Sequence, residues 1–243
     1  MSAIPANGSP TANRILNQLP PEEYERLSPH LEPVKLSLGD VIHCPQDPVS
    51  HVYFPNRGTV SVIAAFADGG GVEVGLVGNE GVFGINVVLG SVTTPHEAIV
   101  QLSGDGMRAS SDVLRREFKR GGQLQDLLLR YTQAFIVQIA QTAACNKVHP
   151  LDGRLARWLL MTCDRATGDE LELTHEFMAF MLGTRRAGVT EAAGRLQDAG
   201  LIRYRRGRVT VLDRRGLEAA SCECYPIVKK EFDHLLGVNG QAT

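Results

Sequence analysis

The feature that most constrains this chain is an arginine-rich segment near its C-terminal end, in which two helical patterns precede a hairpin pattern. From Thr184 to Arg215 this segment holds nine arginines and three acidic residues, a formal charge of +6. The whole chain has 25 basic and 27 acidic side chains, so the remainder holds 16 basic and 24 acidic ones. A nearly neutral protein that gathers its positive charge in one compact segment has a face suited to a polyanion.

Local signals predict a helix, a tight turn and a second helix at the start of this segment. Thr174 is a suitable N-cap for the first helix, and Gly183 can adopt the positive φ angle at which that helix ends. Thr184 is expected to cap the second helix, which Gly200 ends. Two sets of apolar residues at helical spacing would form the buried faces. They are Phe177, Met178, Met181 and Leu182 in the first helix, and Val189, Ala192, Ala193 and Leu196 in the second.

The exposed side of the second helix carries residues that suit contact with DNA. Residues at the start of a recognition helix reach base edges in the major groove, where arginine can bind guanine O6 and N7 with two hydrogen bonds. Arg185 and Arg186 are therefore expected in the major groove, with Thr190 beside them. Thr174 and Thr184, at the helix starts, are expected to donate hydrogen bonds to phosphates.

Two alternating runs, 201–204 and 209–212, flank Arg206-Gly207 and predict a tight β-hairpin that would act as a wing. Arg205 and Arg208 on this hairpin are expected to touch the DNA backbone or the minor groove. Two alternatives are a merely solvated charged surface and a winged domain that contacts protein instead of DNA. The order of cap, turn, buried stripe and wing favours a winged helix-turn-helix that binds double-stranded DNA.

This segment resembles the C-terminal half of Crp/Fnr-type bacterial transcription regulators, through the capped helix, the motifs GTRRAGV and GRLQDAGLI, and the hairpin. Residues 151–166 are similar to the helix that opens the DNA-binding domain of that family, and residues 36–63 to the start of its cyclic-nucleotide-binding-type β-roll. The resemblance covers about residues 14–225. The expected partners are double-stranded DNA with a pseudo-palindromic operator, a second copy of the chain and RNA polymerase.

The resemblance also aligns Arg186 with a base-reading arginine of the family. Two positions depart from the family pattern, because Glu191 stands where relatives carry another base-reading arginine and Ala187 replaces a glutamate. We therefore expect an operator that differs from the familiar one.

The N-terminal half has a different pattern. Residues 1–12 are predicted to be a frayed tail, and residues 13–31 carry a helical pattern broken by Pro20-Pro21. From residue 36 to about 108, short alternating runs separated by turn residues predict a small antiparallel barrel or roll. The expected fold class is α+β: an N-terminal antiparallel, jelly-roll-like β-roll, a long dimerisation helix and a C-terminal winged helix-turn-helix. The expected division is 1–12 tail, 13–122 sensor roll, 123–148 dimerisation helix and 149–243 DNA-binding domain.

A long helix is predicted between the two domains. Residues 123–146 contain no proline and no glycine, and 24 helical residues would span about 36 Å. Apolar residues recur along it at helical spacing and are the expected dimer interface: Leu124, Leu128, Tyr131, Phe135 and Ile139. A parallel helix from a second subunit would cover this stripe, and the alternative is a core helix that packs only within its own domain.

The family resemblance also identifies a candidate effector site in the roll. Cyclic-AMP-binding relatives hold the ribose hydroxyl with a Gly-Glu segment and the phosphate with an Arg-Ser pair. The matching segment here is Gly78, Asn79, Glu80 and Gly81, and the phosphate end contains His96 and Glu97 in place of arginine. Because Glu97 would repel a phosphate, we expect a ligand that is not a cyclic mononucleotide bound in the usual manner, or no ligand at all. In the latter case the glycines only form turns.

No other chemistry stands out in the sequence. The five cysteines are scattered, which argues against a disulfide framework, and none precedes Cys44, as a family-type iron–sulfur site would require. Cys145 is expected to be a small core residue, and Cys222 and Cys224 ordinary helix residues, so no metal site and no cofactor are predicted. Without a nucleophile–base or P-loop pattern, an enzyme is not expected. Without a signal peptide or a long apolar run, we expect a cytoplasmic protein with no membrane partner.

Overall fold

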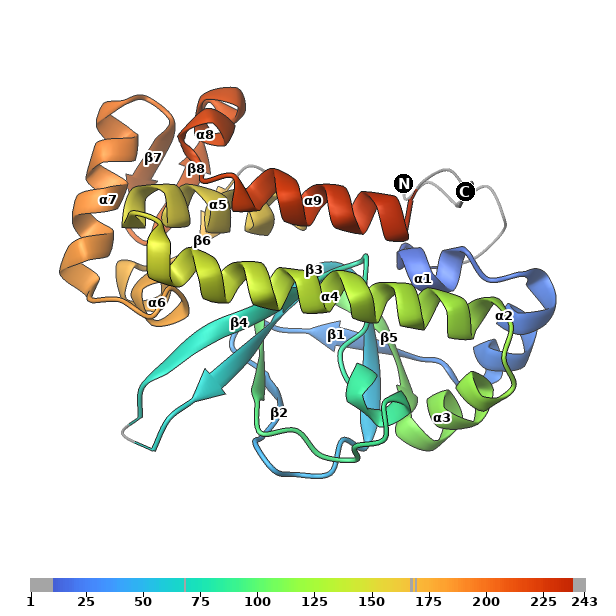
Figure 1. Ribbon diagram of the computed structural model, residues 1–243. Helices are drawn as coiled ribbons and strands as arrows, with labels where there is room; N and C mark the ends of the chain where they lie inside the picture. Colours follow the sequence, from blue (N-terminus) through green and yellow to red (C-terminus); the bar gives the residue numbers. More distant parts are fainter. Residues whose placement is uncertain (1–10, 68, 167, 169, 238–243) are drawn as a thin grey trace.

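The computed structural model describes residues 11–237 of the 243-residue chain, apart from residues 68, 167 and 169 (Figure 1). The predicted tail at 1–12 therefore lies mostly outside the described residues. Its last two residues are held, since Thr11 Oγ1 donates to Asn56 Oδ1 at 2.6 Å and the Ala12 amide to the same oxygen at 3.0 Å. No helix in the described part of the chain combines the length and hydrophobicity that a membrane-spanning segment needs.

The N-terminal half is an antiparallel β-roll, as predicted. Its strands are β1 (Glu32–Leu36), β2 (Val41–His43), β3 (His51–Ala65), β4 (Gly71–Val77) and β5 (Glu97–Ser110). They follow the order β1-β5-β3-β4, and β2 also pairs with β5. Short helical segments adjoin the roll: α1 (Arg14–Asn17), α2 (Pro21–Leu27), η1 (Ser28–His30), η2 (Ile85–Val88) and α3 (Ser111–Lys119).

One expected turn in the roll is instead a bulged part of a long strand. The pattern at 56–58 predicts a turn between two strands, but the structure continues β3 through it, with shifts of the β3–β5 register between Pro55 and Val60. Gly58 has a φ of 81°, and a Cβ there would lie 2.5 Å from the Leu102 carbonyl oxygen. A bulge with a glycine lets the strand bend without ending. The single strand β3 therefore pairs with β5 on both sides of the bulge.

The long helix α4 (Gln123–Val148) is two residues longer than predicted and forms the spine of the molecule. The roll lies along one side of it and α9 (Cys224–Leu235) along another (Figure 1). Leu124, Leu128 and Tyr131 are buried within the single chain. The expected assignment of these three side chains to a dimer seam is therefore corrected, because the chain's own core already covers them.

A different face of α4 is left uncovered. Leu129 is 48% exposed and Ile136 is 54% exposed. Exposed residues continue this face at alternating spacings of four and three: Leu129, Gln133, Ile136, Ala140 and Ala143. The helix thus has apolar residues on more than one side, and spacing alone did not distinguish the side that faces the core from the side that faces outward.

The C-terminal domain follows directly after α4. Its helices are α5 (Leu151–Cys163), α6 (His175–Met181), α7 (Arg186–Asp198), α8 (Arg214–Ala220) and α9. Its strands β6 (Glu170–Glu172), β7 (Ile202–Arg205) and β8 (Arg208–Val211) form a sheet in the order β6-β8-β7. The predicted hairpin is thus part of a three-stranded wing, in which β6 was not anticipated.

Polar contacts join this domain to the roll. Trp158 Nε1 of α5 donates to Glu73 Oε1 of β4 at 2.9 Å. Ser61 Oγ lies 2.7 Å from Glu73 Oε2 and 2.7 Å from Gln101 Oε1. A hydroxyl has only one hydrogen to donate, so a protonated Glu73 that donates to Ser61, which in turn donates to Gln101, satisfies all three groups. Burial raises the pKa of Glu73 to about 7, although its hydrogen bonds with Ser61 and Trp158 lower it.

Replacing Glu73 with Gln is expected to remove a pH dependence of stability. The pKa of Glu73 rises from an ordinary 4.5 to about 7 on folding, so the folded chain holds more protons in this window and its stability falls as the pH rises through it. Above pH 7 the buried carboxylate costs about 3 kcal/mol, at about 1.4 kcal/mol per pKa unit. Urea unfolding at pH 5 and pH 8 should show Glu73→Gln more stable than the original chain at pH 8 and nearly equal at pH 5. Glu97→Gln, in the same sheet, is the control, and parallel pH profiles for all three proteins would contradict the assignment.

Candidate nucleic-acid interface

Both helices of the predicted motif are present, and the N-cap of the second helix lies one residue later than predicted. Thr174 Oγ1 accepts from the Phe177 amide at 3.1 Å, as predicted for the first helix, and Gly183 has a φ of 58° where that helix ends. The expected cap at Thr184 is wrong, because the N-cap of α7 is Arg185 and no side chain caps it. The amide of Thr184 donates to the carbonyl of Ala179 at 2.9 Å. That bond closes the end of the first helix, so the second helix begins one residue later than predicted.

The two faces of α7 separate as predicted. The residues of the expected inner stripe, Val189, Ala192, Ala193 and Leu196, are all buried. Arg185, Arg186 and Thr190 are exposed on the other side. Arg186 Nε lies 3.9 Å from Glu176 Oε2, and both side chains are largely exposed. Such an exposed pair contributes little free energy, so Arg186 can exchange this carboxylate for a base or a phosphate at small cost.

His175 is a residue of this face that the sequence argument missed. Its Nδ1 lies 2.9 Å from Thr190 Oγ1, and its ring stacks on Tyr204 at a centroid distance of 4.0 Å. Burial lowers the pKa of His175, and Arg186 lowers it further. The neutral ring therefore links α6, α7 and β7 and fixes the position of Thr190. The only sequence signal for a role of His175 at this face was its position directly after the N-cap Thr174.

The strand register determines which side chains of the wing face outward and which face the core. Arg203 lies opposite Thr210 and Arg205 opposite Arg208, and these four residues line a cleft together with Glu170 and Arg206. Tyr204 and Val209 face inward, where Val209 is buried. The turn uses Arg206 at a φ of 51° and Gly207 at 77°, which suits a two-residue hairpin.

Several arginines of the segment are bound to carboxylates of the chain. Arg208 lies 2.9 Å from Glu170 and 3.4 Å from Glu172, Arg195 binds Asp152 with two bonds of 2.7 Å, and Arg214 pairs with Asp164 and Glu218. Within the described part of the chain, no carboxylate lies within 4 Å of Arg185, Arg203, Arg205 or Arg206. The formal charge of +6 therefore overstates the positive charge that is available to a partner. Among the wing arginines, Arg205 and Arg206 are better placed than Arg208 to contact a polyanion, because Arg208 is already paired with Glu170 and Glu172.

The start of α6, the exposed face of α7 and the wing tip lie on one side of the domain. The Leu173 amide donates to the Gly207 carbonyl at 2.8 Å, which holds the start of α6 against the tip of the wing. The contact between Thr190 and His175 joins the same point to α7. We call the resulting surface the basic surface; it consists of Thr174, Arg185, Arg186, Thr190, Arg205 and Arg206.

The expected effector segment is occupied by the chain itself. Glu80 is buried, and its Oε1 lies 2.7 Å from Arg165 Nη2, which follows α5 in the C-terminal domain. The same oxygen accepts from the Gly78 amide at 3.1 Å. The backbone carbonyls of Asn79 and Gly81 accept from the Arg14 amide at 2.7 Å and from Asn13 Nδ2 at 2.9 Å. These four residues thus hold the N-terminal segment and the C-terminal domain against the roll.

His96 and Glu97 do not join that segment. The cavity lined by Asn79 and Glu80 is also lined by Arg165, Tyr225 and other residues of the C-terminal half, and neither His96 nor Glu97 lines it. His96 Nδ1 lies 3.1 Å from Thr94 Oγ1, burial lowers the pKa of His96, and Glu97 pairs with Ile63 at the start of β5. His96 and Glu97 therefore do not share that cavity with Asn79 and Glu80.

Comparison with known proteins identifies the domain and the fold. Residues 153–220 match the family of Crp-like helix-turn-helix domains. The chain is 26% identical over 180 residues to the global nitrogen regulator of Nostoc sp., covering 70% of this chain and 80% of that protein.

Solved structures agree over most of the chain. FixK2 from Bradyrhizobium japonicum superposes with a TM-score of 0.68 at 16% identity, covering 79% of this chain and 98% of FixK2. A Crp/Fnr-family transcriptional regulator from Thermus thermophilus gives 0.64 at 22% identity, covering 78% and 98%. Residues 153–220 therefore form a Crp-like helix-turn-helix domain, and the chain has the fold of Crp/Fnr-family transcription regulators. The helix-turn-helix of this domain is formed by α6 and α7, and the basic surface lies on these two helices and on the wing.

Side chains that could hold a metal lie elsewhere in the chain. Cys145 and His149, at the end of α4, lie beside Cys222 and Cys224, which flank the start of α9. Their ligand atoms are all within 4.8 Å of one another. His234, ten residues after Cys224, is exposed on α9 and does not belong to this group.

Replacing Arg186 with Ala is expected to weaken binding to the preferred operator by about 1–3 kcal/mol and to relax specificity at one base pair. Arg195→Ala is the matched control on the same helix, because Arg195 is bound to Asp152 and faces away from the basic surface. Binding of a randomised operator library by each protein measures both quantities. An equal loss on every sequence would make Arg186 a phosphate contact and contradict its base-reading role.

Proposed function

We propose that this chain binds a specific DNA sequence as a homodimer, and that its roll does not bind cyclic AMP through the phosphate grip of its relatives. The observation that carries the proposal is the basic surface. Its arginines lie at the start of α7 and at the wing tip, and Arg185, Arg205 and Arg206 have no carboxylate partner among the described residues. Arginines kept free in this arrangement suit phosphates and base edges. A winged domain that contacts protein is the weaker alternative.

We further propose that residues 13–122 are the sensor domain, 123–148 the dimerisation helix and 149–243 the DNA-binding domain. In this division Arg185 and Arg186 enter the major groove, Thr174, Thr184 and Thr190 contact the backbone, and Arg205 on the wing reaches the minor groove or a phosphate. Arg208 contributes less, because Glu170 and Glu172 already balance its charge.

The exposed face of α4 supports the homodimer. Leu129, Gln133, Ile136, Ala140 and Ala143 repeat at the alternating spacing of a coiled-coil seam. The two alanines are small enough to let a second helix approach closely. Phe135 and Ile139, both half-buried, flank this seam and are the part of the expected interface that stays available to a partner. A two-fold pair of α4 helices would present two α7 helices to a pseudo-palindromic operator.

The effector proposal rests on the residues at the expected site. Glu80 is paired with Arg165 inside the chain, and Glu97 stands where a phosphate would need a cation. Between Arg57 and Arg108, His96 is the only basic residue in the sequence. These features disfavour an anionic ligand in the roll and leave an uncharged ligand, or none. RNA polymerase remains an expected partner.

Replacing Ile136 with Asp is expected to break the dimer and, with it, binding to the full operator. The two new carboxylates would face each other across the seam, and desolvating them would cost more than the contact returns. Because Ile136 is exposed in the single chain, the change should leave the fold of each subunit intact. Sedimentation equilibrium measures the assembly, and Leu89→Asp, an exposed apolar position on the roll, is the control. An unaltered dimer would place the interface elsewhere.

Cyclic AMP at millimolar concentration is expected to leave both the melting temperature and the operator affinity unchanged. A ligand at 100 times its dissociation constant adds about 2.7 kcal/mol to stability, so binding would be visible in a melt. A thermal-shift screen of the purified protein against cyclic mono- and dinucleotides, haem and uncharged metabolites measures this directly. A clear shift with cyclic AMP would overturn the interpretation of the Glu80 and Glu97 positions.

A further inference from the structure

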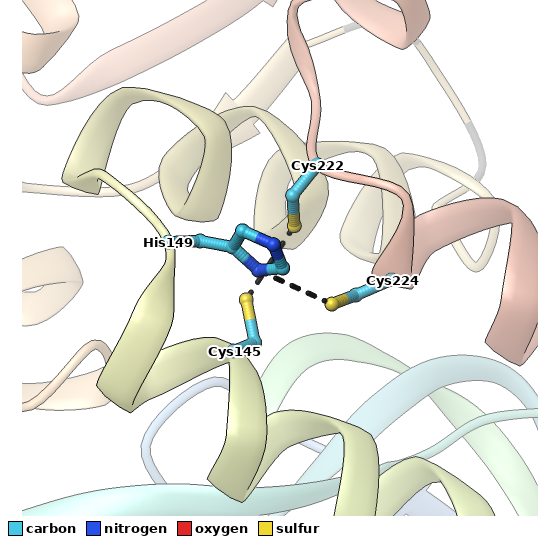
Figure 2. A group of neighbouring side chains, drawn as sticks. All are labelled: Cys145, His149, Cys222 and Cys224. Carbon is cyan, nitrogen blue, oxygen red and sulfur yellow. Dashed lines mark hydrogen bonds between the residues drawn. The ribbon is translucent and has the colours of Figure 1, made fainter.

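Three thiols and one imidazole meet where α4 ends and α9 begins (Figure 2). Cys145 Sγ lies 3.4 Å from Cys222 Sγ, and Cys224 Sγ lies 3.4 Å from His149 Nδ1. Cys145, Cys222 and Cys224 are buried, and His149 is mostly covered. The residues come from segments more than 70 positions apart, so the fold alone brings them together.

The spacing of these atoms suits a single tetrahedral ion. Zinc bonds of about 2.3 Å to sulfur and about 2.0 Å to nitrogen place neighbouring ligand atoms about 3.5–3.8 Å apart. All four ligand atoms lie within 4.8 Å of one another, so small side-chain movements bring each of them onto one centre. A two-iron cluster would spread the same ligands over two metal atoms and needs a wider arrangement. We propose that Cys145, His149, Cys222 and Cys224 form a structural Zn²⁺ site.

The surroundings of the four residues match those of a metal site. His149 presents Nδ1 to the sulfurs, while its Nε2 lies 3.2 Å from Glu223 Oε2. A histidine that binds a metal commonly donates its other ring N–H to a carboxylate, which fixes the ring and strengthens it as a ligand. Gln141 Nε2 donates to Cys224 Sγ at 3.2 Å, a contact that stabilises a thiolate. Glu223 and Gln141 thus act as positioning residues for the site.

A buried cation near the site completes its charge balance. Arg157 is buried, and its Nε has no hydrogen-bond partner within the described part of the chain. Its Nη1 donates to neutral acceptors, Thr142 Oγ1 and Met161 Sδ, and it acts electrostatically on Cys145. Three thiolates, one neutral histidine and Zn²⁺ carry a net charge of −1. An anionic centre of this kind would give the buried guanidinium a charge partner in addition to the Glu73 carboxyl group, on which Arg157 also acts.

A disulfide between Cys145 and Cys222 explains less of this arrangement. It would use two of the three thiols and leave the contacts of Cys224, His149 and Glu223 without a role. A zinc ion uses all of them, and it ties the end of α4 to the segment between α8 and α9. His149 directly precedes Pro150 and α5, where the DNA-binding domain begins. The ion would therefore fix the orientation of that domain relative to α4.

The test is metal binding by the full-length chain, purified under reducing conditions and measured without DNA. After incubation with Zn²⁺ and gel filtration, elemental analysis should find one zinc per chain. Co²⁺ in place of Zn²⁺ should give the thiolate charge-transfer band and the intense visible bands of a tetrahedral site. Cys145→Ser and Cys224→Ser should each lose the bound metal and these bands. Cys44→Ser, an exposed thiol outside the group, should retain both.

Two variants keep the test decisive if the cysteine replacements do not fold. Glu223→Gln, at an exposed residue, should keep one zinc per chain but lower its affinity about 10- to 100-fold. His149→Gln should alter the cobalt spectrum. The proposal would be overturned if the reduced original chain bound no zinc, or if it formed a Cys145–Cys222 disulfide in place of the metal. It would also be overturned if Glu223→Gln bound zinc with unchanged affinity, or if His149→Gln left the cobalt spectrum unchanged. Because no DNA is present, these outcomes are independent of operator binding.

Discussion

The packing of α4 is the constraint on which the rest of this structure depends. A helix of 26 residues has several long faces, and here the roll covers one of them and α9 another (Figure 1). The third face is exposed and carries Leu129 and Ile136. One helix therefore supports the roll, anchors the end of the helix-turn-helix domain and offers the surface that we assign to a second subunit.

The position of the DNA-binding domain follows from contacts on both sides of its first helix. On the roll side, Glu73 accepts from Trp158 and Glu80 pairs with Arg165, so two buried carboxylates of the roll hold α5 and the residues after it. On the far side, the cluster around Cys145 lies where α4, the segment before α5 and the start of α9 meet. Contacts on both sides of α5 therefore fix how the basic surface is presented relative to the roll and α4.

Ion pairs within the chain decide which arginines remain available on the basic surface. Arginines 195, 208 and 214 are held by carboxylates of the chain, and such pairs hold the domain together more than they attract DNA. The arginines at the start of α7 and at the wing tip stay exposed. A count of charges therefore locates the correct segment, whereas the partners of each arginine decide which of them can bind phosphate or read a base.

Local signals in the sequence determined most of the elements. The cap at Thr174, the positive φ at Gly183, the inner stripe of α7, the Arg206-Gly207 turn and the long helix are confirmed because each depends on neighbouring residues. Tertiary structure alone decided which face of α4 is covered, since Leu124 and Tyr131 are no more apolar than Leu129 and Ile136. It also decided that Glu80 meets Arg165 and that Cys145 and His149 join Cys222 and Cys224. These contacts join residues far apart in the chain, and spacing along a sequence carries no information about which distant segments pack together.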